Sequence, residues 1–338
     1  MFKKKGFDYK KYIDAQSLAV LKRISEFDKL YLEFGGKLTY DGHASRVLPG
    51  FKTSTKIELL KNLGDLEIIY CLNAKDLEGK RKLGDFNLTY QEQALKDFSD
   101  IKKFGLKVNH LCITRFDGEK QAKAFGDKIE KKGIDVYYHK EIEGYPANVK
   151  KIIQGYATQP LIKTKAKLII VTGASGGSGK MATCMTQVYN EKRKGKKAGY
   201  SKYELFPIWN LPLNHPINIA YEAATADLGD YNMIDPYHLK AHKIKAINYN
   251  RDVENFAILK KLYELAAGKK GTLRFKSPTD MGMNMAKKGI INDKVCRKAA
   301  IKEIKRRDKV YKKEYKAGRE TKKTIDTITK ILNKVKAK

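Results

Sequence analysis

The residues with the clearest chemistry lie in a glycine-rich turn at residues 174–180, Ala-Ser-Gly-Gly-Ser-Gly-Lys. The apolar run at 168–171 predicts a buried strand before the turn, and the residues from 180 onward have a helical pattern. Strand, glycine-rich turn and helix in this order are typical of a phosphate-binding loop, where backbone N–H groups, the helix N-terminus and a lysine contact phosphate. We therefore predict phosphate contacts from Gly177, Ser178, Gly179 and Lys180.

This turn departs from the usual phosphate-loop pattern at two positions. Ala174 stands where the pattern has its first glycine, and Met181 stands where a Ser or Thr hydroxyl normally holds Mg²⁺. A structural tight turn between strand and helix is the alternative interpretation. If a metal ion is used, its ligands must come from another part of the chain.

Length and composition indicate a globular protein with a sizeable core. The chain has 338 residues, of which 42% are hydrophobic, with 20 Tyr and 13 Phe. We expect three parts: an α/β subdomain at 1–165, a subdomain with the phosphate loop and an acidic, loop-rich segment at 166–300, and a basic helical tail at 301–338.

The net charge of +32 would attract nucleic acid, anionic membranes or phosphorylated metabolites. Only 11 of the 70 basic residues are Arg, the side chain that nucleic-acid readers favour for bidentate contacts. Lysines spread over every predicted helix favour a solvated surface, and a clustered nucleic-acid-binding surface is the alternative.

Cysteine usage and hydropathy bear on the compartment. The four cysteines are far apart and have no metal-ligand spacing, which favours a reduced, cytoplasmic protein. No segment approaches the ~20 apolar residues of a membrane-spanning helix, and the N-terminus has no apolar signal region. We also expect assembly into a homo-oligomer.

Strands and helices alternate through the first half of the chain. Helical spacing of apolar residues occurs at 10–27, 56–63, 90–104, 117–132 and 146–155, and short apolar runs occur at 30–34, 66–72, 108–114, 134–139 and 168–171. Strands joined by helical crossovers predict an α/β fold with a mainly parallel, doubly wound sheet, followed by a loop-rich and helical second half.

In such a sheet, ligands bind at the edge where the strands end. Polar residues follow several predicted strands and should gather there: Gly35, Gly36, Lys37, Asn73, Lys75, Asp76, Thr114, Arg115, His139 and Lys180. We predict that Gly35, Gly36, Lys37 and Lys75 join the phosphate loop in binding an anionic ligand. Each residue taken alone could equally be an ordinary polar loop residue.

The segment 201–238 differs from the rest of the chain. It has one basic residue, Lys202, five acidic residues, four of the eight prolines and the only Trp. An ordered segment of this kind is often functional, and we expect it to close over a site with Asp227 or Asp235 as ligands of Mg²⁺. A local network of helix caps and turns is the alternative.

Three side chains outside the loop are candidates for catalysis. His43 could act as an acid or base, Arg46 could clamp a phosphate or carboxylate, and Arg251 could stabilise charge on a transferred phosphoryl group. Structural roles are open for each of them. His238 and His242 would share a helix face, but no flanking Glu completes a zinc-protease motif.

The tail at 301–338 carries 15 basic and 5 acidic residues, and aliphatic side chains recur at helical spacing from Ile325 to Val335. Such a basic amphipathic helix can bind lipid or nucleic acid, or pack on the body of the protein. We expect packing on the body.

Several segments together resemble a bacterial family of uncharacterised proteins, the domain-of-unknown-function family 1846, also called uncharacterised protein family 0371. The segments are 34–38 (Phe-Gly-Gly-Lys-Leu), 43–51 (His-Ala-Ser-Arg-Val-Leu-Pro-Gly-Phe), 73–76 (Asn-Ala-Lys-Asp), 177–184 (Gly-Ser-Gly-Lys-Met-Ala-Thr-Cys), 206–213 (Phe-Pro-Ile-Trp-Asn-Leu-Pro-Leu), 223–227 (Ala-Ala-Thr-Ala-Asp), 248–252 (Asn-Tyr-Asn-Arg-Asp) and 277–282 (Ser-Pro-Thr-Asp-Met-Gly). The resemblance covers about residues 1 to 305.

The resemblance implies a fold but no established reaction. The family's loop usually runs Pro-Gly-Pro-Gly-Ser-Gly-Lys, so this chain keeps Lys180 but has a more flexible approach to it. Family members also continue with a further C-terminal domain, whose place the Lys-rich tail takes here. If that domain completes the site or the oligomer, this chain is expected to be inactive or differently assembled.

These patterns lead us to expect an enzyme that binds ATP, another nucleotide or a phosphorylated small molecule, with Mg²⁺, at residues 173–181. The competing hypothesis is a nucleic-acid-binding or scaffold protein without catalysis, which acts through its positive charge.

Overall fold

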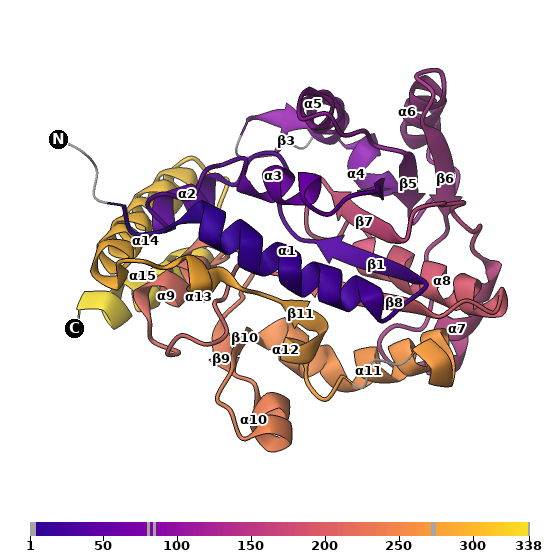
Figure 1. Ribbon diagram of the computed structural model, residues 1–338. Helices are drawn as coiled ribbons and strands as arrows, with labels where there is room; N and C mark the ends of the chain where they lie inside the picture. Colours follow the sequence, from indigo (N-terminus) through magenta and orange to yellow (C-terminus); the bar gives the residue numbers. More distant parts are fainter. Residues whose placement is uncertain (1–4, 80–81, 84–85, 272–274, 337–338) are drawn as a thin grey trace.

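The computed structural model describes residues 5–79, 82–83, 86–271 and 275–336, and its centre is a seven-stranded sheet (Figure 1). The strand order across the sheet is β11-β8-β1-β7-β2-β5-β6, and every neighbouring pair is parallel. The strands are β1 (Lys29–Phe34), β2 (Leu66–Asn73), β5 (His110–Thr114), β6 (Asp135–His139), β7 (Leu168–Gly173), β8 (Ala198–Tyr203) and β11 (Gly282–Met283).

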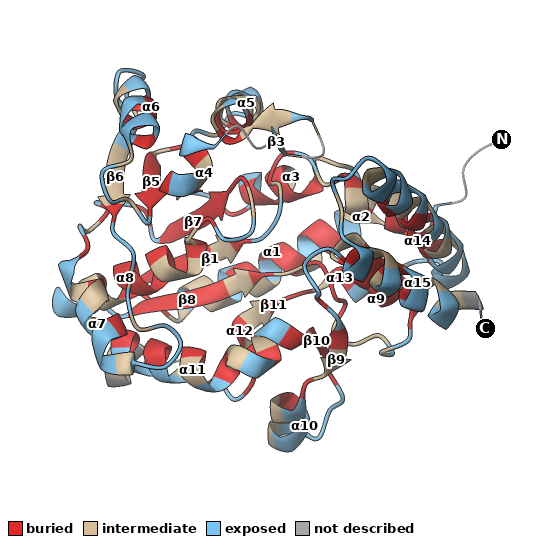
Figure 2. Ribbon diagram, turned by 180° about the vertical axis from the view of Figure 1, so that it is seen from behind, coloured by how far each residue is buried: buried red, intermediate tan, exposed pale blue. Residues whose placement is uncertain are grey.

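Both faces of this sheet are buried, and the strand side chains divide between them. In β7, Leu168 and Ile170 join one apolar core, whereas Ile169 and Val171 join the other. This alternation follows from the two-residue repeat of a strand, and continuous apolar runs are typical of parallel strands covered on both faces. Figure 2 shows the strands as largely buried between helices with exposed outer surfaces.

Two groups of helices cover the two faces. The first core contains side chains from α1 (Tyr9–Ser25), α3 (Thr55–Lys61), α5 (Tyr90–Lys103) and α6 (Lys120–Glu130). The second core contains side chains from α7 (Val149–Thr158), α8 (Lys180–Arg193) and α11 (Asn250–Gly271). The predicted α/β fold with a doubly wound parallel sheet is therefore confirmed.

The remaining elements are short or lie outside the sheet. They are α2 (Gly42–Val47), α4 (Ala74–Glu78), β3 (Lys82–Leu83), β4 (Leu88–Thr89), α9 (Pro216–Ala224), β9 (Asn232–Ile234), α10 (Pro236–His242), β10 (Ile247–Tyr249), α12 (Pro278–Met281), α13 (Ala286–Gly289), α14 (Asp293–Lys316) and α15 (Lys322–Lys336). β9 and β10 form an antiparallel pair, as do β3 and β4. α10 follows β9 and projects away from the sheet in both views (Figures 1 and 2).

The sheet spans the predicted division at residue 165. β1 and β2, from the first predicted subdomain, pair directly with β7 from the second, and β1 also pairs with β8. The chain therefore returns to the middle of its own sheet after residue 165. α14 likewise crosses the predicted start of the tail at residue 301.

The helix α15 packs on the body, as we expected for the tail. Ile328 and Ile331 of α15 are buried in the first core, and Lys334 forms a 2.9 Å ion pair with Glu222 of α9. None of the helices in the described ranges combines the length and apolar character needed to cross a membrane.

Strand order determines where the connections of this sheet change from one face to the other. From β1 and β2 the chain passes to helices of the first core, whereas from β7, which lies between these two strands, it passes to α8 in the second core. The connections thus leave adjacent strands toward opposite faces. Ligands of doubly wound sheets bind beyond the strand ends at such a point.

Candidate functional site

A cavity of about 940 Å³ opens beyond the ends of β5, β6 and β7, and we call it the loop cavity. Residues from several separate segments line it, which include Lys75, Thr114, Arg115, His139, Gly177, Gly179, Lys180 and Arg251. The volume lies within the range of small-molecule and cofactor sites, roughly 300–1,000 Å³. The predicted phosphate loop therefore forms part of the wall of a cavity large enough for a nucleotide.

Glycines determine the path of this loop. A Cβ atom at Gly173 would lie 2.5 Å from the carbonyl oxygen of Cys71 and 2.6 Å from Oγ of Ser178, so the loop can fold back onto the end of β7 only without a side chain there. Gly177 and Gly179 have φ values of 79° and 81°, a conformation that glycine adopts at little cost. Local backbone geometry thus explains why glycine occurs at positions 173, 177 and 179.

The turn presents backbone hydrogen-bond donors that have no backbone acceptor among the described residues. Within the described part of the chain, the amides of Gly176, Gly177 and Gly179 donate to no backbone carbonyl. Lys180 begins α8, and its ammonium group lies 3.0 Å from the carbonyl oxygen of Ser175 and 3.3 Å from Oγ of Ser178, both in the loop. Amides at a helix N-terminus together with a lysine are the donors that phosphate oxygens require.

Thr114 at the end of β5 holds the loop from the opposite side. Its hydroxyl lies 3.1 Å from the carbonyl oxygen of Ser178, and a Cβ atom at Gly179 would lie 2.7 Å from the Thr114 side chain. The close approach between β5 and the start of α8 therefore depends on Gly179.

We expect Gly179→Ala to lower the free energy of unfolding by about 1–3 kcal/mol, since it combines a left-handed backbone conformation with a steric clash. Gly176→Ala is the matched control, because a Cβ atom at Gly176 meets nothing within 4 Å. Urea denaturation measures both variants. An equal, small effect of the two substitutions would contradict the assigned packing.

The charges around the loop cavity are partly neutralised. Glu141 lies 3.8 Å from the ammonium group of Lys75 and 3.6 Å from Nε of Arg115, and all three side chains are about half exposed or more. Arg251 forms an ion pair of 2.6 Å with Asp230. Exposed pairs of this kind are weak, so an anionic ligand can compete for Lys75 and Arg115 at little cost.

His139, at the end of β6, is buried and uncharged. Burial lowers the pKa of its ring to about 4, and Nε2 lies 3.0 Å from the carbonyl oxygen of Pro160. This histidine shapes the cavity wall but adds no positive charge at neutral pH.

The second group of predicted residues lines a separate cavity of about 270 Å³ near the ends of β1 and β8, which we call the β1 cavity. Its wall includes Gly35, Gly36, Lys37, His43 and Arg46. Gly36 has a φ of 68°, and the Lys37 ammonium group lies 4.5 Å from the ring centroid of Phe86. Most of the predicted anion-binding and catalytic residues therefore divide between two cavities.

His43 and Arg46 contact a buried carboxylate that lies 257 residues or more away in the sequence. Glu303 of α14 accepts a 2.9 Å hydrogen bond from Nε of Arg46, and its other oxygen lies 3.5 Å from Nδ1 of His43. Arg306 and Arg307 donate to the same carboxylate. Burial of His43 lowers the pKa of its ring below the ordinary value. These contacts favour a structural role for Arg46, whose guanidinium is already paired.

A cluster of charged side chains lies beside the β1 cavity at the ends of β1 and β8. Lys202 forms an ion pair with Asp252 of α11, and Glu33 accepts a 2.7 Å hydrogen bond from the hydroxyl of Tyr200. Glu204 lines the β1 cavity, and its Oε1 has no hydrogen-bond partner among the described residues. Burial raises the pKa of the Glu204 carboxyl, Lys202 opposes this, and Asp252 and Glu33 add to it, so that the pKa is about 8.

This pKa predicts a pH dependence of stability. Since the folded protein binds a proton at Glu204 more tightly than the unfolded chain, the free energy of unfolding should fall as the pH rises from about 4.5 to about 8 and then level off. In Glu204→Gln, the decrease in the free energy of unfolding that is caused by loss of the Glu204 proton should be absent. Urea denaturation across this pH range measures it, with the exposed Glu264→Gln as control. A wild-type profile identical to that of Glu204→Gln would contradict the prediction.

Asp227 and Asp235 line neither cavity, and their carboxylates have protein partners. Asp235 is buried, caps α10 through the amide of His238 at 2.9 Å, and accepts a 2.7 Å hydrogen bond from the Thr279 hydroxyl. Asp227 accepts a 3.0 Å hydrogen bond from the hydroxyl of Tyr311. Their contacts favour the network of caps and turns that the sequence left open, so the Mg²⁺ role stays a prediction that the geometry does not favour.

Sequence patterns did not single out several residues that the fold brings to these cavities. Glu33 lines the loop cavity and Glu204 the β1 cavity, while Asp252 of α11 and Glu303 of α14 pair with side chains beside them, and these long-range neighbours cannot be read from local sequence patterns. A carboxylate within an apolar strand, Glu33 in β1, was the one available signal, because charged residues in buried strands need a partner.

Comparisons with known proteins identify the family of the chain, but the names of its members describe no reaction. Residues 5–336 match the family profile described as "Domain of unknown function DUF1846, N-terminal". A "UPF0371 protein" of Clostridium tetani (strain Massachusetts / E88) is 48% identical over 336 residues, which is 98% of this chain and 66% of the relative. Proteins of the same name from Clostridium botulinum strains ATCC 19397 / Type A and Alaska E43 / Type E3 are 46% and 45% identical over the same shares. The chain thus spans about 66% of the length of these relatives.

Proposed function

This chain belongs to the DUF1846 family, whose description assigns no reaction, and we propose that it is an enzyme that binds a nucleotide or another phosphorylated small molecule in the loop cavity. In this proposal the amides of the turn and the ammonium group of Lys180 hold phosphate, and Lys75 and Arg115 offset the remaining negative charge. The observation that carries the proposal is the glycine turn itself, which lines a cavity of about 940 Å³ with Lys180 and with amides that have no backbone acceptor among the described residues.

Lys180 is the cation best suited to this role. Among the described residues, no carboxylate forms an ion pair with its ammonium group, whereas Lys75, Arg115 and Arg251 each have an acidic neighbour. A phosphate that replaces the Ser175 carbonyl as partner of Lys180 would gain a charge-assisted hydrogen bond without the loss of an ion pair. The donor set therefore favours an anion over a neutral ligand.

For Mg²⁺ we propose ligands other than the two carboxylates predicted from the sequence. Glu33 and Glu141 line the loop cavity, and carboxylate oxygens are the ligands that Mg²⁺ prefers. Mg²⁺ usually binds through one or two carboxylates together with substrate phosphates. We therefore include Mg²⁺ in the proposal as an ion that arrives with the nucleotide.

Thermal unfolding in the presence of ATP, GTP and sugar phosphates, each with and without Mg²⁺, tests the proposal. A ligand at a hundredfold excess over its Kd should add about 2.7 kcal/mol to the free energy of unfolding. If none of these compounds stabilises the protein, the loop is a structural turn and the proposal is wrong.

A groove along α14 favours nucleic-acid binding as the second candidate. Lys294, Lys298 and Lys302 recur every four residues in this helix and line a groove of about 1,100 Å³. Such a row can follow a phosphate backbone, and binding of that kind weakens steeply with salt. The salt dependence of binding separates the two candidates. If the affinity for the phosphorylated small molecule changes little between about 50 and 200 mM salt, this supports the first candidate.

A further inference from the structure

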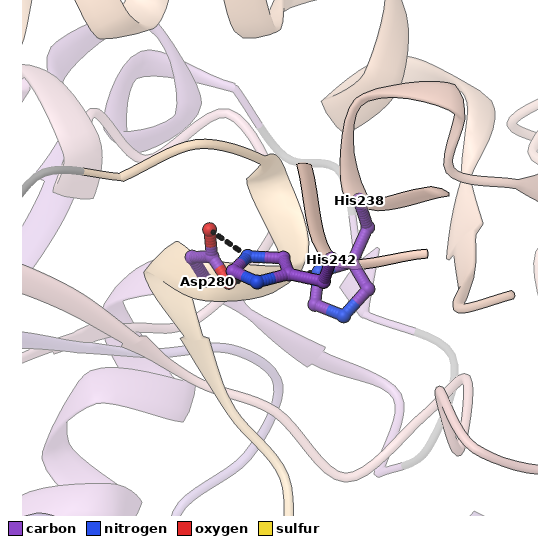
Figure 3. A group of neighbouring side chains, drawn as sticks. All are labelled: His238, His242 and Asp280. Atoms are coloured by element: carbon purple, nitrogen blue, oxygen red, sulfur yellow. Dashed lines mark hydrogen bonds and ion pairs between the residues drawn. The ribbon is translucent and has the colours of Figure 1, made fainter. Parts of the chain in front are cut away.

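Three potential metal ligands come together where α10 lies beside α12. His238 and His242 belong to α10, and Asp280 belongs to α12 (Figure 3). Nε2 of His242 lies 3.0 Å from one oxygen of Asp280, and Nδ1 of His238 lies 3.5 Å from the other. One ligand atom from each residue lies within 4.8 Å of the other two.

Helix geometry explains why the two histidines adjoin. Residues four apart lie on the same face of a helix, and the two imidazole centroids are 4.5 Å apart. Asp235 and Pro236 determine where α10 begins, so the helical register places both rings toward α12. The two histidines are therefore presented as a pair by one short helix.

Hydrogen bonds place Asp280 against this pair. Ser277 caps α12 by accepting a 3.1 Å hydrogen bond from the amide of Asp280, and the amide of Lys276 donates to the Asp280 carboxylate at 2.9 Å. The hydroxyl of Thr279 donates to Asp235 at 2.7 Å and so joins α12 to the start of α10. The three ligands thus rest on two helices that are tied together independently of any metal.

Nδ1 of His238 is the ring nitrogen that lies toward Asp280. An imidazole nitrogen binds a metal through its lone pair. Nδ1 of His238 also lies 2.9 Å from the Ser277 hydroxyl, which can rotate away to release that lone pair.

We propose that His238, His242 and Asp280 form a binding site for Zn²⁺, with water in the fourth position. Two imidazole nitrogens and one carboxylate oxygen are a ligand set that zinc adopts in sites open to solvent. Ligand atoms around tetrahedral zinc lie about 3.3 Å apart, so a separation near the 4.8 Å upper limit must shorten by about 1.5 Å, a shift that side-chain rotation supplies.

The surroundings of the group are compatible with this assignment. His242 is about one third exposed, which leaves a path for the ion and for water. The Trp209 ring covers His238 from another side, with centroids 5.7 Å apart. None of the three ligands lines the loop cavity or the β1 cavity. The ion would therefore clip α10 to α12, and its binding does not depend on the phosphate proposal.

Isothermal titration of the metal-free full chain, without an affinity tag, with ZnCl₂ tests this site. We expect one Zn²⁺ per chain, and a Kd at least about tenfold higher for His242→Gln and for Asp280→Asn. Lys240→Gln, in the same helix but outside the group, should bind as the wild type does.

Co²⁺ provides a second readout that reports coordination directly. The wild type should give the visible absorption of tetrahedral Co²⁺, and His242→Gln should lose it. Because His242 is partly exposed, His242→Gln should retain its fold, which the thermal unfolding midpoint checks. The assignment would be overturned if the wild type does not bind zinc, or if His242→Gln and Asp280→Asn bind zinc as tightly as the wild type does. The three side chains would then be only a hydrogen-bonded cluster.

Discussion

Lys180→Met should weaken the binding of the phosphorylated ligand about 10- to 150-fold, the equivalent of losing one charge-assisted hydrogen bond of roughly 1.5–3 kcal/mol. Met is similar in length to Lys and lacks the ammonium group. Within the protein, the substitution removes the two hydrogen bonds that the ammonium group makes to the turn. We expect the fold to persist, because this loss is confined to the turn. Titration calorimetry with the ligand that stabilises the wild type most measures the effect.

Lys192→Met is the matched control for this substitution. Lys192 belongs to the same helix, α8, but its ammonium group contacts the carbonyl oxygen of Leu265 at the other end of that helix. Loss of the Lys192 ammonium group should leave the Kd of the phosphorylated ligand unchanged. An equal change in the two variants would mean that general positive charge, and not the loop, attracts the ligand.

Glu303→Ala should lower the free energy of unfolding by about 3 kcal/mol, the lower end of the range of about 3–5 kcal/mol observed when one partner of a buried ion pair is removed. Glu303 is almost fully buried, and Arg46, Arg306 and Arg307 all donate to its carboxylate. Without it, the three guanidinium groups lose the carboxylate that they share. The arginines are partly exposed and can turn toward water, which limits the loss.

Glu314→Ala is the control, because Glu314 also belongs to α14 and pairs with an arginine, Arg319, at the protein surface. Exposed pairs contribute about 0–1 kcal/mol, so this variant should be close to the wild type. Urea denaturation at neutral pH compares the two. If Glu303→Ala is as stable as Glu314→Ala, the buried cluster does not hold α14 to α2.

The fold could be predicted in outline from local patterns. Each of the five predicted strands lies within two residues of an observed one, because apolar runs such as 168–171 end in glycines or polar residues that mark the strand boundary. The order of the strands could not be predicted. The residues around Leu168 do not indicate that β7 lies between β1 and β2, because that order depends on how helices pack on both faces of the sheet.

The candidate site was predictable where it depends on one continuous segment. The turn before Lys180 carries its own glycine signals, and it lies at the sheet edge that the pattern predicted. The role of Arg46 was not predictable, because its partner Glu303 follows 257 residues later. Asp280 joins His242 across 38 residues in the same way. Long-range ion pairs leave no periodic pattern in a sequence.

A structure of the protein with the most strongly stabilising phosphorylated ligand tests the central claim most directly. We predict that phosphate oxygens lie within hydrogen-bond distance of the Lys180 ammonium group and of the amides of Gly177 and Gly179. A ligand whose phosphate instead lies against Lys294, Lys298 and Lys302 in the groove along α14, with the loop cavity empty, would contradict it.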